Sequence, residues 1–275
     1  MRKNAWVICC CTAVLAAFGT FFRWLQDQVC FEAETGLAVR GSIWPYAVAL
    51  MIVIAAVVLA VVCFRMKNQP HTYFPDSLPA ALAASPRVRT IGGIVLGALL
   101  AVGGLWLLLG SGTLASPGLQ RVLAVLAIAA GAAFARQMLA PGDVETASGA
   151  VVCASMPIVL LAFWLIVSYK VNIINPTVSA YAVEILALCA ALIASYEFAG
   201  FAYGRPKAIK SIFWSQFAAF LCITALPDDR AGGQQLMLAA IAGMLLFQSY
   251  LTAFLLTMVN REAKADEMTP IQIPT

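Results

Sequence analysis

The sequence predicts an all-α integral membrane protein, a polytopic bundle of about eight transmembrane helices with no soluble domain. Two features of the composition predict this class: 62% of the residues are hydrophobic and only 11% are charged, whereas soluble domains carry roughly 25% charged residues. The third observation is that the apolar runs are long and continuous instead of short and alternating. Such runs form spanning helices, because a helix satisfies all of its backbone groups internally.

Eight apolar segments approach the roughly 20 residues that a helix needs to cross the hydrocarbon core. In chain order they cover residues 5–22, 46–64, 91–109, 122–139, 150–167, 180–202, 211–226 and 236–259. The first follows Arg2 and Lys3, and its apolar run exceeds the ~7–15 residues of a secretory signal. We therefore expect it to be retained as a helix. The seventh is short, carries Ser215 and Gln216 and stops at Pro227, which fits either a tilted span or a re-entrant helix.

Small residues on the third and fourth segments predict close helix packing. The third carries Gly93, Gly97, Ala101 and Gly104 at helical spacing, and the fourth contains AIAAGAAFA at 127–135. Small side chains let membrane helices approach one another closely. We interpret both segments as ordinary packing surfaces of the bundle.

The basic residues predict the orientation. If all eight segments cross the membrane and the N-terminus is cytoplasmic, twelve Lys and Arg residues lie inside and five lie outside. The inner set is Arg2, Lys3, Arg65, Lys67, Arg87, Arg89, Arg136, Arg205, Lys207, Lys210, Arg261 and Lys264. The outer set is Arg23, Arg40, Arg121, Lys170 and Arg230. This bias follows the positive-inside rule, so we expect both termini in the cytoplasm.

The domain organisation is simple. Residues 1–260 are expected to form a single transmembrane domain, and residues 261–275 a polar, disordered cytoplasmic tail. The longest connections, 23–45 and 65–90, are too short to fold alone, since isolated domains below about 40 residues usually need disulfides, a metal or oligomerisation to be stable. Within the second connection, LPAALAASP could form a short surface helix. The composition and the short loops suit a multi-pass protein of a bacterial plasma membrane.

The sixth segment carries two carboxylates, Glu184 and Glu197, in otherwise apolar sequence. A charged side chain at membrane depth is costly and marks a functional-site hypothesis. Glu197 shares a helical stripe with Ala190 and Ala194, so we expect it to point into the bundle. Glu184 lies near the outer end and is assigned no special role.

Several polar residues are candidate partners of Glu197 for ligand binding or proton coupling. They are Arg136 and Gln137 on the fourth segment, Tyr196 beside Glu197, Gln216 on the seventh and Gln248 on the eighth. Two interpretations stay open. An ion pair with Arg136 would be structural and fix the helix register, whereas an unpaired carboxylate would be a protonatable or cation-binding group in a transport path.

Known catalytic and cofactor motifs are missing from the sequence. It contains no GxxxxGK[ST] loop, and His71 is the only histidine, which excludes HExxH and Ser–His–Asp arrangements. The spacing of the cysteines fits no metal site. We therefore predict no cofactor, no metal and no catalytic residue, and we favour a protein that is not an enzyme. The net charge of +4 follows from the orientation and gives no support for nucleic-acid binding.

Outside the segments, Asp228 and Asp229 precede Arg230, a pattern typical of a solvated turn. A weaker possibility is an acidic outer vestibule formed with Asp27, Glu32 and Glu34.

Three functional hypotheses follow. The first is a transporter or permease for a small solute or ion, with its polar site around Glu197 in the inner half of the bundle. The alternative is a non-catalytic membrane subunit or scaffold, such as the permease partner of a separate ATPase, with residues 65–90 docking a cytoplasmic protein. A membrane-embedded lipid-modifying enzyme ranks last. In every case the lipid bilayer is a partner.

Overall fold

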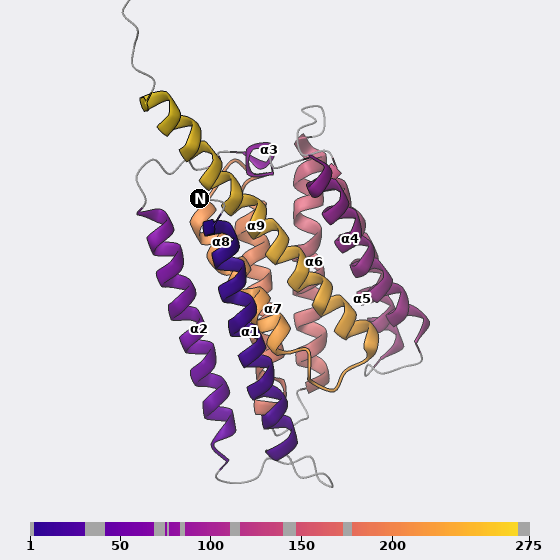
Figure 1. The fold of residues 1–275 in the computed structure, drawn as a ribbon. Helices are drawn as coiled ribbons and strands as arrows, with labels where there is room; N and C mark the ends of the chain where they lie inside the picture. Colours follow the sequence, from indigo (N-terminus) through magenta and orange to yellow (C-terminus); the bar gives the residue numbers. More distant parts are fainter. Residues whose placement is uncertain are drawn as a thin grey trace, which may run out of the picture.

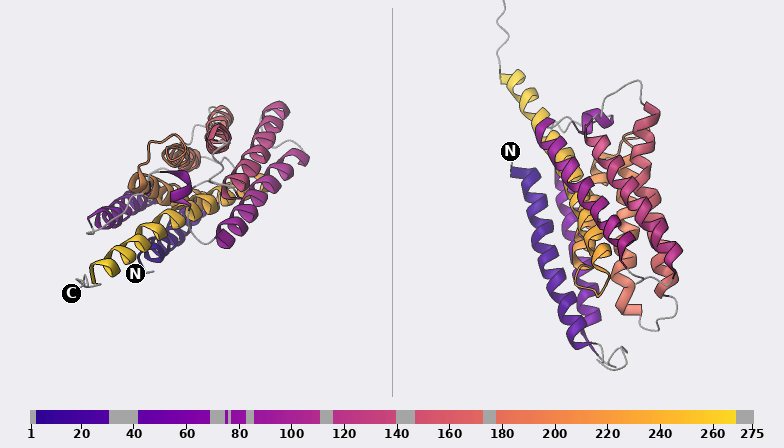
Figure 2. Two further views of the ribbon diagram at one scale, coloured as in Figure 1. Left: turned by 90° about the horizontal axis from the view of Figure 1, so that it is seen from above. Right: turned by 90° about the vertical axis from the view of Figure 1, so that its right-hand side faces the viewer.

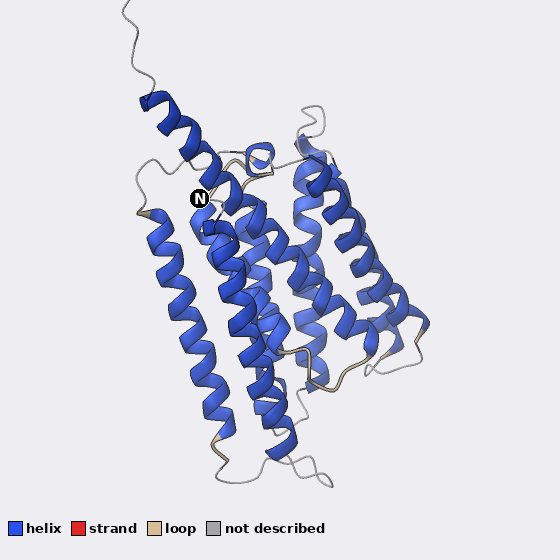
Figure 3. Cartoon of the chain, viewed as in Figure 1, coloured by secondary structure: helices blue, strands red, loops and turns tan. Residues whose placement is uncertain are grey.

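The computed structural model describes residues 3–30, 42–68, 75, 77–82, 86–110, 116–139, 147–172 and 178–268. These residues form helices and no strand (Figure 3). The helices are α1 (Lys3–Val29), α2 (Trp44–Lys67), α3 (Leu78–Ala81), α4 (Pro86–Leu109), α5 (Pro117–Leu139), α6 (Ala147–Asn172), α7 (Val178–Ala199), α8 (Ala208–Thr224) and α9 (Gly232–Met268), as Figure 1 shows.

Each of the eight predicted segments coincides with a helix. Seven of the described helices are long and apolar enough to cross a membrane, namely α1, α2, α4, α5, α6, α7 and α9. The helix of the seventh predicted segment, α8, has 17 residues and corresponds to the segment 211–226, which is short in the sequence. It ends at Thr224, because Pro227 disfavours the helical conformation of the residue before it. The chain is thus a multi-pass helical membrane protein.

The long helices run alternately up and down, so that α1 begins and α9 ends at the same end of the bundle (Figure 1). We call this the amino end. The α4–α5 pair lies on one side and α1 with α2 on the other, while α9 passes between them and contacts α1, α4, α7 and α8 (Figure 2). The buried core therefore centres on α7, α8 and α9.

The α4–α5 pair confirms the close packing predicted from the small residues. A Cβ atom added to Gly97 would lie 2.5 Å from the carbonyl oxygen of Gly131, which no real side chain tolerates. Further along the pair, a Cβ on Gly104 would lie 2.8 Å from the carbonyl oxygen of Ala124. The two backbones are in contact at both levels, as small residues allow.

The outward faces of the bundle are apolar. On α2, large side chains at every turn are exposed, namely Leu50, Val53, Val57, Val61 and Phe64. An apolar surface that covers whole helices matches hydrocarbon and not water.

Two further sequence expectations concern the 65–90 connection and the tail. The short helix predicted within LPAALAASP exists as α3, which buries Leu78 and Ala81 against the bundle and exposes Pro79. Arg89 holds it in place by donating to the carbonyl oxygens of Leu82 and Met138, both at 2.9 Å. At the other boundary, α9 continues to Met268, past the predicted start of the tail, and residues 269–275 lie outside the described part.

Candidate functional site

Two groups stand out among the buried polar side chains, and others, such as Gln120 and Ser168, are buried elsewhere. The first, which we call the amide cluster, consists of Ser195 on α7, Gln216 on α8, and Gln248 and Ser249 on α9. The second, which we call the ion network, consists of Arg23 on α1, Glu184 on α7, and Asp228 and Arg230 in the α8–α9 connection. The amide cluster lies toward the amino end, and the ion network lies toward the opposite end.

The amide cluster is held by a hydrogen bond between neighbouring helices. The Nε2 atom of Gln216 donates to the Oγ atom of Ser249 at 2.8 Å and lies 3.5 Å from the Sγ atom of Cys9 on α1. Gln216 is 0% exposed, and its Oε1 atom has no hydrogen-bond partner among the described residues. The amide thus keeps one free acceptor inside the bundle.

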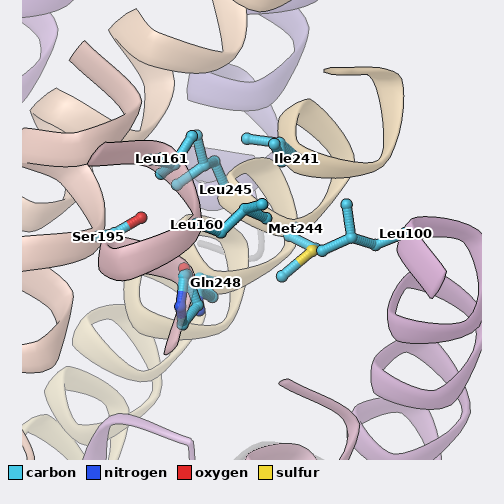
Figure 4. A pocket seen from close by; sticks show the side chains of 9 residues that line it. Leu100, Leu160, Leu161, Ser195, Ile241, Met244, Leu245 and Gln248 are labelled. Carbon is cyan, nitrogen blue, oxygen red and sulfur yellow. The ribbon is translucent and has the colours of Figure 1, made fainter. Parts of the chain in front are cut away.

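Ser195 and Gln248 line a small cavity between α4, α6, α7 and α9 (Figure 4). Its volume is about 20 Å³, and a buried water needs roughly 10–15 Å³ of such volume. The other walls are apolar and include Leu100, Leu160, Leu161, Met244 and Leu245. Neither polar side chain hydrogen-bonds to another described residue, so the cavity offers hydrogen-bonding capacity that the protein itself leaves unused.

Pro157 on α6 also lines this cavity. A proline inside a helix has no N–H, so the carbonyl of the residue four positions earlier, Cys153, lacks its helical partner. Proline is also the commonest cause of a helix bend. The α6 wall of the cavity therefore lacks one backbone hydrogen bond of a regular helix.

Unpartnered polar atoms occur at further buried positions of the described helices. They are the Oγ atom of Ser215, the Nε1 atom of Trp164 and the Nε2 atom of Gln137, with Oε1 of Gln120 nearer the opposite end. A buried polar atom without a partner costs about 1–3 kcal/mol, and native proteins contain few of them. The four atoms are distributed over α5, α6 and α8, and none of their side chains lines the cavity of Ser195 and Gln248.

Glu197, the centre of the sequence hypothesis, lies in the last turn of α7, two residues before its end at Ala199. Its side chain is half-buried and makes no ion pair with a described residue. Arg136 is exposed on α5, so the pair with Arg136 that the sequence suggested does not form. Tyr196 is 65% exposed and faces away from the core.

The other candidates are distributed over three helices. Gln216 and Gln248 both belong to the amide cluster, on the adjacent helices α8 and α9. Gln137 is buried on α5. The small-residue stripe predicted on α7 is confirmed, since Ala190 and Ala194 are buried.

The ion network is a chain of alternating charges. The Nε atom of Arg23 lies 2.6 Å from Oδ1 of Asp228, and Nη2 of Arg230 lies 2.6 Å from Oδ2 of the same carboxylate. The Nε atom of Arg230 lies 3.3 Å from Oε2 of Glu184. Arg23 is only 1% exposed, and ions at this degree of burial persist only when paired.

Both arginines also donate hydrogen bonds to backbone carbonyls, and Arg23 donates to the side chain of Gln26. Arg23 donates from Nη1 to the carbonyl of Ser179 at 2.8 Å and to Oε1 of Gln26 at 3.1 Å. Arg230 donates from Nη1 to the carbonyl of Ala225 at 3.1 Å. The α8–α9 connection is therefore tied to both α1 and α7.

Two sequence interpretations are wrong here. Asp228 and Arg230 do not form a solvated turn, since Asp228 is 7% exposed and bonded on both oxygens, although Asp229 is exposed. Glu184 is 8% exposed and paired with Arg230, so it has a structural role. The connection that follows the short helix α8 packs the side chains of Asp228 and Arg230 against α1 and α7. Arg23 at the end of an apolar run was the signal that could have revealed the network.

Of the acidic residues suggested to form an outer vestibule, Asp27 belongs to the described residues. Asp27 lies 3.9 Å from Arg23, and Glu32 and Glu34 lie outside the described residues. In the part of the chain that the structure describes, no group of three His, Cys, Asp or Glu side chains could hold a metal ion. The chain matches no family model, no curated protein and no solved structure.

Proposed function

We propose that the protein is a small membrane permease whose polar path runs through the amide cluster and opens toward the amino end near Glu197. The observation that supports this most strongly is the unused hydrogen-bonding capacity at Ser195, Gln216 and Gln248 in the apolar core. Evolution of a purely structural core would replace such groups by apolar ones, because these give equal or better stability. Polar groups that face a cavity are explained by a solute that uses them.

Glu197 stands at the amino-end mouth of this path in the proposal. Its side chain is half-buried and makes no ion pair with a described residue, so its oxygens can accept hydrogen bonds from a solute that enters there. Arg136 and Tyr196, which are exposed, are not included in the path.

The proposed orientation places the amino end in the cytoplasm of the cell that makes the protein, with all eight segments crossing the plasma membrane. The positive-inside rule counts the Lys and Arg residues of short loops near the ends of the spans. Twelve of these residues fall on the amino-end side and five on the other in this orientation, which supports it.

A thermal-shift screen of the detergent-purified protein tests the proposal. Ions, amino acids, sugars, nucleosides and vitamins would be added singly at two pH values to the wild type, to Glu197→Gln and to Gln248→Leu. A ligand of the native state raises the melting temperature by mass action. We expect at least one compound to stabilise the wild type and to lose its effect in Gln248→Leu.

Two outcomes of the screen and of purification would count against the permease. If no compound stabilises the wild type and both variants melt like it, the polar path has no ligand. A stoichiometric soluble partner that co-purifies with the wild type and is lost when residues 65–90 are replaced by Gly-Ser would then favour the subunit hypothesis.

A further inference from the structure

We infer that the amide cluster accepts a small uncharged solute that both donates and accepts hydrogen bonds, and that it excludes ions. This inference rests on the proposed function and specifies the chemical class of its solute. Three properties of the cluster support it: its charge, its hydrogen-bonding groups and the shape of the cavity beside it.

The first property is the lack of fixed charge. The four members of the amide cluster are neutral side chains, and the walls of the adjoining cavity are apolar apart from Ser195 and Gln248. Of the two carboxylates on α7, Glu184 is occupied by Arg230 and Glu197 lies in the last helical turn. An ion in an apolar interior without a counter-charge costs several kcal/mol. The cluster therefore presents a barrier to ions.

The second property is the mixture of donors and acceptors. Within the cavity, Gln248 offers an amide with two donors and a carbonyl oxygen, and Ser195 offers a hydroxyl that can do either. Gln216 on α8 has a free acceptor at Oε1 but does not line the cavity. A molecule that pairs with both Ser195 and Gln248 needs both kinds of group, as do water, amides and polyols. A purely accepting anion or a purely donating ammonium would leave part of the site unpaired, and such mismatches are strongly disfavoured.

The third property is size. A volume of about 20 Å³ admits a single water molecule, so anything larger enters only when a wall moves. Pro157 marks the point at which α6 can bend to widen the cavity. The leucine and methionine side chains of the walls offer no polar contact, so Ser195 and Gln248 decide which solutes the cavity can bind. Small, compact solutes are thus favoured over large ones.

The test is a permeability measurement on the full chain in vesicles of phosphatidylcholine and phosphatidylglycerol. Stopped-flow light scattering would report entry of urea and glycerol, and fluorescent indicators would report fluxes of K⁺, Na⁺, H⁺ and Cl⁻. The variants are Gln248→Leu and, as a matched control, Thr252→Val. Thr252 is buried one turn further along α9 and bonds to the carbonyl of Gln248 in its own helix, so it does not serve the cavity.

We expect urea or glycerol to enter wild-type vesicles faster than protein-free vesicles, with this gain lost in Gln248→Leu and kept in Thr252→Val. Ion fluxes should equal those of protein-free vesicles. An ion flux that Gln248→Leu abolishes would overturn the inference about charge while leaving the permease proposal intact. Wild-type permeability equal to that of protein-free vesicles for every probe would overturn both.

Discussion

The ion network and the amide cluster are both buried polar groups, yet the protein satisfies them very differently. In the ion network each oxygen of Asp228 is bonded to its own arginine, and further arginine donors reach Glu184, Gln26 and two backbone carbonyls. In the amide cluster Gln216 keeps a free Oε1 atom, and Ser195 and Gln248 face a cavity. The first region is complete without any other molecule, and the second is not.

This difference separates scaffold from site within one bundle. A saturated network of charges resists removal of any member, because each deletion leaves an unpaired ion in a medium that cannot solvate it. An unsaturated neutral cluster loses little when a member is made apolar, because the free groups already lack partners. Stability should therefore depend on the ion network, and solute handling on the amide cluster.

The largest effect is expected from Asp228→Asn. Asparagine carries no charge and only one acceptor oxygen, so Arg230 would keep only the contact with Glu184 at 3.3 Å, and the nearest carboxylate to Arg23 would be Asp27 at 3.9 Å. Breaking a buried pair in this way costs about 3–5 kcal/mol, which should appear as a strongly lowered melting temperature in detergent. The matched control is Asp229→Asn at the exposed neighbouring position, which should change stability by less than ~0.5 kcal/mol. Equal melting temperatures for the two variants would show that the network does not stabilise the fold.

A smaller loss is expected from Glu184→Gln. Arg230 keeps its bond to Asp228 at 2.6 Å and loses only the longer contact with Glu184 at 3.3 Å. The cost should be about 1–3 kcal/mol, the range for a buried group that loses one partner. A double-mutant cycle with Arg230→Gln checks this, since residues in contact are expected to show a coupling of about 0.5–3 kcal/mol. A coupling of zero would mean that the two side chains act independently.

A still smaller effect is expected from Gln216→Leu. The substitution removes the bond to Ser249 together with the unpartnered Oε1 atom, and these two contributions oppose one another. The net change should be within about 1 kcal/mol, since replacing a poorly paired polar group by an apolar one of similar size is nearly neutral. Chemical denaturation of the purified protein measures it. A loss as large as that of Asp228→Asn would make the amide cluster a structural element.

Gln248→Leu should have the smallest effect on stability. Its side chain makes no hydrogen bond with a described residue, and leucine would fill part of the cavity with apolar atoms. Filling a small cavity stabilises by up to ~1 kcal/mol, so we expect an unchanged or slightly raised melting temperature. A clear decrease would indicate that the amide holds a structural partner.

The sequence predicted the helices well because apolar length is a local property. All eight predicted segments became helices, and the short one, α8, was recognised by its polar residues and Pro227. The ion network was missed because Arg23 and Asp228 are 205 positions apart, and no local pattern connects them. Their proximity depends on how α1 packs against the end of α8.

The Glu197–Arg136 pair, one of the two interpretations that the sequence left open, does not form for a related reason. α5 is rich in alanine all round its surface, so its sequence does not reveal which face is buried, and Arg136 turned out to be exposed. α7 ends at Ala199 because the chain turns sharply after it, with Gly204 in the left-handed conformation at φ +67°. Glu197 consequently lies nearer the end of the bundle than its segment 180–202 implied. Of the candidate partners of Glu197 named from the sequence, Gln137, Gln216 and Gln248 are buried; their role as ligand or proton-coupling groups stays a prediction.

The most direct test of the division into scaffold and site measures stability and permeability together for two variants. Gln248→Leu and Asp228→Asn would be purified, melted in detergent and assayed in vesicles with urea and glycerol, with flux expressed per folded molecule. We predict that Gln248→Leu keeps the wild-type melting temperature and loses the flux. Asp228→Asn should lose stability and keep the flux of the molecules that remain folded. A Gln248→Leu variant that retains wild-type flux while its melting temperature falls like that of Asp228→Asn would contradict the division into scaffold and site.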